Sequence, residues 1–246
     1  MNNVLFLPMK LMMQDHNVNP VEIDKFSALA SKWWDSDSEF KSLHEINPLR
    51  LQWIEEQVGG SLQNLRILDV GCGGGILAES MARRGAQVTG IDLAQASLTT
   101  AKLHGLESGI KVEYHCVAAE DFAREHPNSF DVVTCMELLE HVPQPASIIQ
   151  ACQQLVKPGG YVLFSTINRN PKAFALAIVA AEHLLKMVPK GTHHYNGFIK
   201  PSELMRDARR AGLYLQQLKG LEYNPLRKVY FLSNDTSVNY MLSTRK

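Results

Sequence analysis

The chain has 246 residues, of which 45% are hydrophobic and 20% charged, and its 25 basic and 25 acidic side chains give a formal net charge of zero. This length can bury a substantial core, and it favours one large α/β domain over two small ones. A protein whose main partner is nucleic acid usually carries a basic field that displaces phosphate counterions. The neutral chain therefore argues against nucleic acid as a partner.

Cysteine usage and the N-terminus bear on location. The four cysteines form no CxxC pair and no metal-ligand spacing with histidine, which is typical of small buried residues in a reducing compartment. The N-terminal sequence MNNVLFLPMKLMM lacks the basic start and cleavage site of a secretory signal, so we expect residues 1–18 to be flexible. No apolar stretch reaches the roughly 20 residues that span a bilayer. These features predict a cytoplasmic protein, or one bound peripherally to the inner face of the cytoplasmic membrane.

Two helices are predicted before the first strand. The first covers residues 19–34, with Asn19 as its cap and Pro20 at the first helical position. The second begins with Asn47 as cap and Pro48 next, and it ends at Gly59-Gly60.

From residue 65 onward, short apolar runs alternate with helical stretches, which is the pattern of βαβ units and a parallel sheet. We expect a doubly wound, mostly parallel sheet of seven strands, all within one domain over residues 19–246. The predicted strands are 66–70, 87–91, 111–117, 130–136, 160–166, 213–219 and 228–232, and the predicted helices are 75–84, 94–108, 145–156 and 201–211.

Residues 170–195 form a predicted insertion in this pattern. Asn170 and Pro171 indicate a helix start, residues 173–181 are an unbroken apolar run, and Pro189 and Gly191 indicate a stop. The segment is too short to span a bilayer but suits an amphipathic lid that lies on a membrane surface. An ordinary buried helix that covers the sheet is the alternative, because length alone does not separate the two.

The glycine-rich sequence after the first strand predicts a nucleoside site. The segment reads Asp69-Val-Gly71-Cys-Gly73-Gly-Gly75 and runs directly into a helix. Glycines permit tight turns and close approach to a ligand, and the helix start offers free N–H groups. Asp92 ends the second strand about twenty residues later, where a carboxylate can accept hydrogen bonds from both ribose hydroxyls.

Two cofactor classes use this layout. A dinucleotide site wants glycine or alanine at the sixth position of GxGxxG, and here that position is Ile76. The acidic residue two places before the first glycine, Asp69, instead fits the methyltransferase pattern (D/E)xGxGxG. We therefore expect S-adenosylmethionine rather than a dinucleotide.

A second cluster of polar residues follows the fourth predicted strand, as Glu137-Leu-Leu-Glu140-His141. Ligands in open α/β sheets sit outside the carboxyl ends of the strands, so this segment should lie beside the cofactor. If it turns helically, all three polar side chains share one face and could hold a divalent cation such as Mg²⁺. Alternatively, His141 acts as a general base with Glu140 beside it, but the same nitrogen cannot serve both roles.

Longer segments resemble the ubiquinone biosynthesis O-methyltransferase family. They include SKWWD…FKSLHEINPLR, DVGCGGGILAESMARRGA, VVTCMELLEHVPQP, LVKPGGYVLFSTINRNPKA, MVPKGTHHYNGFIKP and VNYML, and the likeness runs from about Asn17 to the C-terminus. The glycine motif is common to the whole superfamily, whereas the first and fifth segments are specific to this group. One departure is Lys186, where the pattern has arginine before MVPKGTH.

The resemblance implies two O-methylations of polyprenylated phenols, with 2-polyprenyl-6-hydroxyphenol and 3-demethylubiquinol as substrates. It implies that Arg50, Gly71, Asp92 and Met136 contact the cofactor, which agrees with Arg50 as a fork for the methionine carboxylate. A magnesium-type site at the Glu-x-x-Glu-His positions is implied by the mitochondrial relatives. Membrane lipid and other enzymes of ubiquinone biosynthesis are the expected partners. The alternatives are a quinone C-methyltransferase and a non-catalytic lipid-binding subunit.

Overall fold

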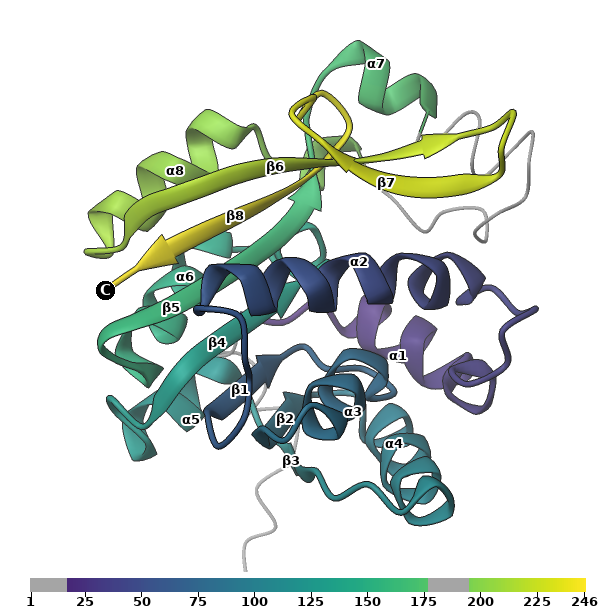
Figure 1. The fold of residues 1–246 in the computed structure, drawn as a ribbon, viewed down its shortest axis with the longest axis vertical. Coiled ribbons are helices and arrows are strands. Elements are labelled where there is room, and N and C mark those ends of the chain that lie inside the picture. Colours follow the sequence, from purple (N-terminus) through teal and green to yellow (C-terminus); the bar gives the residue numbers. More distant parts are fainter. Residues whose placement is uncertain (1–16, 177–194) are drawn as a thin grey trace, which may run out of the picture.

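A single twisted sheet organises the chain in the computed structural model, which describes residues 17–176 and 195–246 (Figure 1). The sheet has eight strands in these ranges, in the order β3–β2–β1–β4–β5–β8–β6–β7. The pairs among β1 to β5 are parallel, whereas β8 runs antiparallel to β5 and β6, and β7 antiparallel to β6. The strands are β1 (Arg66–Val70), β2 (Gln87–Asp92), β3 (Glu113–Cys116), β4 (Phe130–Met136), β5 (Val156–Ile167), β6 (Tyr214–Asn224), β7 (Val229–Ser233) and β8 (Asn239–Arg245).

The predicted fold class is confirmed, with one strand more than the seven expected. The missed strand is β8, which lies between β5 and β6. It reads Asn-Tyr-Met-Leu-Ser-Thr-Arg, and its inner five residues are buried whether polar or apolar. A strand that is covered on both faces needs no alternation of apolar and polar residues, so periodicity gave no signal for it.

Helices cover both faces of the sheet, because the central strands are apolar on both sides. Neighbouring residues of β1 illustrate this: Ile67 belongs to a core with α2, α3 and α4, and Leu68 to a core with α5, α6 and α8. These helices are α2 (Lys41–Gln57), α3 (Ile76–Arg83), α4 (Gln95–Ser108), α5 (Ala119–Glu125), α6 (Pro145–Leu155) and α8 (Pro201–Arg210). Of these, α5 was not expected from the sequence.

The N-terminal helices differ from the prediction in their bounds. Asn19 does cap the first helix, α1 (Pro20–Ala28), by accepting from the Val21 N–H, but a separate 3-10 turn, η2 (Ala30–Lys32), replaces its predicted second half. The predicted start of the second helix was wrong. α2 begins at Lys41, well before Pro48, which lies inside the helix.

Tertiary contacts explain why α2 begins earlier than predicted. Asn47 does not cap a helix, since its side chain donates to the Ser80 hydroxyl at 2.8 Å. The helix start is instead anchored by Phe40, which is buried and stacks on Trp33 with ring centroids 3.9 Å apart. Packing of an aromatic pair thus outweighs the local preference of proline for the first helical turn.

The predicted insertion is described only at its two ends. Asn170 caps α7 (Pro171–Ala173) by accepting from the Ala173 N–H at 2.8 Å, as expected, and the chain returns through the 3-10 turn η5 (Tyr195–Gly197). The proposed lid between them lies outside the described residues, as does most of the expected flexible N-terminus. Within residues 17–176 and 195–246, the structure contains no helix of the length and hydropathy that crossing a membrane requires.

Candidate active site

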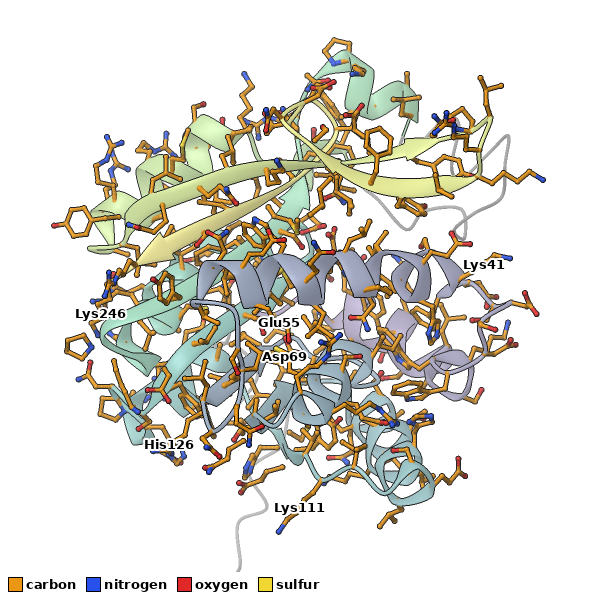
Figure 2. All side chains as sticks on the ribbon, in the orientation of Figure 1. Lys41, Glu55, Asp69, Lys111, His126 and Lys246 are labelled. Atoms are coloured by element: carbon orange, nitrogen blue, oxygen red, sulfur yellow. The ribbon has the colours of Figure 1, made fainter. Side chains whose placement is uncertain are left out.

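A cavity of about 620 Å³ opens at the carboxyl ends of β1, β2 and β4. Its floor is the glycine loop and its walls include α1, α2 and the β6–β7 hairpin, which place residues from both ends of the chain around one space. Figure 2 shows Asp69 near the centre of the molecule, while Lys111 and Lys246 lie at the periphery. All nine predicted site residues line this cavity: Arg50, Asp69, Gly71, Gly73, Asp92, Met136, Glu137, Glu140 and His141.

The glycine loop turns as the motif predicts, with left-handed backbone at Gly71, Gly73 and Gly75. Its glycines also leave room for protein side chains. A Cβ at Gly73 would lie 2.5 Å from the Trp33 ring, and one at Gly75 would lie 2.3 Å from the Tyr114 hydroxyl. The loop therefore packs closely against Trp33 and Tyr114, and Trp33 lines the cavity together with Gly71 and Gly73.

Asp92 stands at the end of β2, beside the loop. Its Oδ2 accepts from the Gly73 N–H at 2.9 Å and its Oδ1 from the Ala94 N–H at 2.8 Å. Burial raises the pKa of this carboxyl, and the backbone donors oppose that rise. A carboxylate has about four acceptor sites, so Asp92 keeps the capacity to accept two hydroxyl groups from a ribose.

Asp69 lies deeper than Asp92, at the end of β1, and only 3% of its surface is exposed. Its Oδ1 accepts from the Thr134 hydroxyl at 2.7 Å. Burial raises the pKa of Asp69 to about 7, despite the Thr134 hydrogen bond and the attraction of Arg50. Asp69 is thus a buried acid beside the glycine loop that also lines the cavity.

Arg50 comes from α2 and is buried beside Glu137, with which it forms an ion pair. Glu137 also accepts from the Ser165 hydroxyl at 2.8 Å. Burial raises the pKa of Glu137, but Arg50 and the hydrogen bonds outweigh burial and keep that pKa below its usual value. The Arg50 Nε is buried, and no described residue accepts a hydrogen bond from it. A ligand carboxylate in the cavity could satisfy this donor.

The pKa of Glu140 is shifted in the opposite direction from that of Glu137. Its Oε2 accepts from the Thr166 hydroxyl at 2.9 Å, whereas no donor among the described residues reaches its buried Oε1. Burial, and next the negative charge of Glu137, raise the pKa of Glu140 well above its usual value. A protonated Glu140 donates a hydrogen bond more readily than it removes a proton.

His141 follows Glu140 in the 3-10 turn η3 (Leu139–His141). Its Nδ1 is 2.7 Å from the Glu22 carboxylate of α1, and the Phe26 ring meets its ring edge-on with centroids 5.3 Å apart. The hydrogen bond with His141 is the largest cause that lowers the pKa of Glu22. Sequence reasoning missed Glu22, because 119 residues separate it from its partner.

The predicted magnesium ligands do not fit a metal as a set. The helical turn expected over 137–141 is broken, since Glu137 has a left-handed φ of 52° and only residues 139–141 turn. Glu137 faces Arg50 and His141 faces Glu22, so no three His, Cys, Asp or Glu side chains in the described ranges gather around a point that could hold a metal ion.

Part of the cavity is bordered by apolar and aromatic side chains of α2 and the β6–β7 hairpin. Leu43 of α2, Leu221 and Tyr223 of β6, and Tyr230 of β7 line it. The rings of Tyr223 and Tyr230 pack with centroids 4.8 Å apart. Sequence analysis placed these strands but assigned them no role, because their apolar residues read equally well as core.

Together, the sheet order, the glycine loop and the acidic residue after β2 define the class of S-adenosylmethionine-dependent methyltransferases. A methyltransferase domain model matches residues 32–218. The fold is shared with magnesium protoporphyrin IX methyltransferase from Synechocystis PCC 6803, solved with bound S-adenosylhomocysteine, at a TM-score of 0.64 and 16% identity, over 93% of this chain and 95% of that one. It is also shared with an S-adenosylmethionine-dependent methyltransferase from Aquifex aeolicus (TM-score 0.58, 15% identity, 92% and 98% of the two chains).

Within that class, the chain belongs to the ubiquinone biosynthesis O-methyltransferase family. It is 64% identical to the family member of Bordetella bronchiseptica (strain RB50) over 94% of this chain and 95% of that protein. It is 63% identical to the Chromobacterium violaceum member and 61% identical to the Pseudomonas entomophila member, with 94% and 93% of this chain and 98% and 97% of those proteins covered.

Proposed function

We propose that this chain transfers the methyl group of S-adenosylmethionine to a phenolic oxygen of polyprenylated phenol and catechol intermediates in ubiquinone biosynthesis. The observation that carries the proposal is a single cavity whose lining includes the glycine loop, Asp92, His141 and the side chains of Leu221 and Tyr230. A donor nucleoside, a phenol and the start of a prenyl tail thus fit in one space.

The donor would be held by the residues at the carboxyl ends of β1, β2 and β4. Asp92 accepts from the ribose hydroxyls, Arg50 binds the methionine carboxylate through its guanidinium, and Gly71 and Gly73 allow close approach of the backbone. Met136, at the end of β4 and 92% buried, packs against the bound cofactor. Asp69 lies buried beside the loop.

The chemistry needs little from the protein beyond placement and one proton acceptor. The phenolic oxygen attacks in line, an O–CH₃ bond forms as the S–CH₃ bond breaks, and the sulfonium becomes the neutral thioether of S-adenosylhomocysteine. The sulfonium methyl is already activated, so placement supplies most of the rate. A free phenol ionises near pH 10, like tyrosine, so its proton must be removed at neutral pH.

We assign proton removal to His141 and hydrogen-bond donation to Glu140. The imidazole offers a ring nitrogen that can accept a proton, whereas burial and the charge of Glu137 raise the pKa of the Glu140 carboxyl and so favour its protonated form. Both side chains line the cavity. A neutral Glu140 beside the second oxygen of a catechol would orient the ring without repelling a phenolate.

The test is turnover of a short-chain polyprenyl catechol with labelled S-adenosylmethionine, followed by fragmentation of the product in a mass spectrometer. Label on oxygen is expected, and label on a ring carbon would indicate a C-methyltransferase.

Calorimetry should give binding of the donor to the wild type and a roughly hundredfold weaker affinity for Asp92→Ala, since two hydrogen bonds to a charged group are lost. Donor binding without turnover of any phenol would favour a non-catalytic subunit.

We also propose that the protein works peripherally on the cytoplasmic face of the membrane, where a polyprenyl substrate resides. Leu226, at the tip of the β6–β7 hairpin, is 95% exposed and is followed by Arg227 and Lys228. An exposed apolar residue beside basic ones suits an anionic lipid surface.

Vesicle flotation tests this second proposal. Leu226→Glu should weaken flotation with vesicles that contain anionic lipid. Leu106→Glu is the matched control, because Leu106 is 80% exposed but lies on α4, at the other end of the molecule (Figure 1). Equal flotation of the wild type and both variants would argue against a contact through the hairpin.

A further inference from the structure

Glu22 is an unusual residue for a short surface helix. It lies in α1 and is only 7% exposed, although an isolated buried carboxylate is costly and charged residues are rarely buried unless they are paired. The N-terminal helix could have packed on the domain through apolar side chains alone. The burial of the Glu22 carboxylate must therefore be explained by the residue with which it pairs.

The partner is His141, on the loop after β4. The Glu22 Oε2 accepts from His141 Nδ1 at 2.7 Å, while Lys25 lies 3.5 Å from the same oxygen. Phe26 packs edge-on against the imidazole. The histidine ring is thus held by a hydrogen bond and by an aromatic contact, both from α1, and both Glu22 and His141 line the cavity.

We infer that Glu22 is a positioning residue that fixes the orientation and tautomer of His141. A carboxylate that accepts from Nδ1–H leaves Nε2 without a hydrogen, so Nε2 is the nitrogen that takes the phenolic proton. The inference rests on the proposed function, because it gives Glu22 a purpose only if His141 acts on a phenol. The same logic holds for the acid behind the histidine of serine proteases, where it orients the ring.

A purely structural role is the alternative, since α1 is also fastened to this loop elsewhere. Asn17 donates to the Gln144 carbonyl at 2.8 Å and accepts from the Gln144 N–H at 2.7 Å. If Glu22 only added to this attachment, its loss would act on all substrates alike. A positioning role acts only on substrates whose proton must be removed.

The experiment compares Glu22→Gln with the wild type on two phenols. One is a short-chain polyprenyl catechol, and the other is its nitro-substituted counterpart, which is ionised at neutral pH and needs no base. The amide introduced by Glu22→Gln can donate a hydrogen bond to His141 Nδ1. This favours the tautomer that carries its hydrogen on Nε2, and in that tautomer Nε2 cannot accept the phenolic proton. For the plain catechol we expect kcat to fall roughly 10- to 100-fold with KM nearly unchanged, as for the loss of a general base. For the nitro compound we expect less than about a threefold change.

Asn17→Ala is the matched control, because it removes the attachment to Gln144 and leaves the Glu22–His141 contact in place. It should change the two substrates by the same factor. An equal loss on both phenols in Glu22→Gln, or no loss on either, would overturn the inference while leaving the proposed function standing. A wild type that methylates neither phenol would overturn the proposed function first.

Discussion

The two halves of the cavity are built in different ways. The cofactor half, made of Asp69, the loop 71–75 and Asp92, comes from one continuous βαβ unit and is fixed by backbone hydrogen bonds. The substrate half, made of Glu22, His141 and Tyr230, draws on α1, the loop after β4 and the β6–β7 hairpin. The geometry of the first half is therefore set mostly by local contacts, and that of the second by contacts between segments that are distant in the sequence.

The largest expected effect is a loss of stability on substitution of a glycine in the loop of the cofactor half. Gly75→Ala should destabilise the protein by about 4 kcal/mol, because a Cβ would lie 2.3 Å from the Tyr114 hydroxyl and because the backbone is left-handed there. Gly59→Ala is the control, since Gly59 is also left-handed but has nothing within 4 Å of a built Cβ. It should cost about 1 kcal/mol. Urea unfolding measures both, and equal losses would mean that strain alone, not packing, sets the requirement for glycine.

These local features were within reach of the sequence. The motif from Asp69 to Gly75 and the distance to Asp92 encode a turn, a helix start and a strand end within one supersecondary unit, so spacing alone placed them correctly. The alternation of strands and helices predicted the fold class for the same reason.

The remaining features depend on tertiary contacts, which the amino-acid sequence alone does not reveal. The start of α2 is fixed by the stacking of Phe40 on Trp33, and the left-handed backbone of Glu137 breaks the turn that would have aligned it with His141. The partner of His141 lies 119 residues away, and no periodicity points to it. The substrate half could therefore be anticipated only at His141 and Glu140.

Asp69 provides the next prediction, on the dependence of stability on pH. Burial raises its pKa to about 7, so the folded state holds a proton that the unfolded state gives up near the ordinary aspartate pKa of 3.8. This group therefore supports folding below the unfolded pKa, and its contribution is lost as pH rises towards 7. Asp69→Asn keeps an acceptor for Thr134 and removes the titration. The variant should gain about 2 kcal/mol relative to the wild type between about pH 5 and about pH 8. Urea unfolding at both pH values checks this, and a gap that does not change with pH would contradict it.

The smallest expected effect concerns the apolar end of the substrate half. Tyr230 points into the cavity from β7, whereas Phe231 follows it on the other face of the strand and is 40% exposed. Tyr230→Ser should raise KM for a long-tailed catechol several-fold, about 1 kcal/mol, because it removes apolar contact area from the tail. It should leave KM for a tail-less catechol nearly unchanged, since the ring binds nearer His141. Phe231→Ser is the control for general loosening of the hairpin and should treat both substrates alike. If Tyr230→Ser also weakened both substrates equally, the tail would have to leave the site by another route, and the hairpin would belong to the fold rather than to substrate selection.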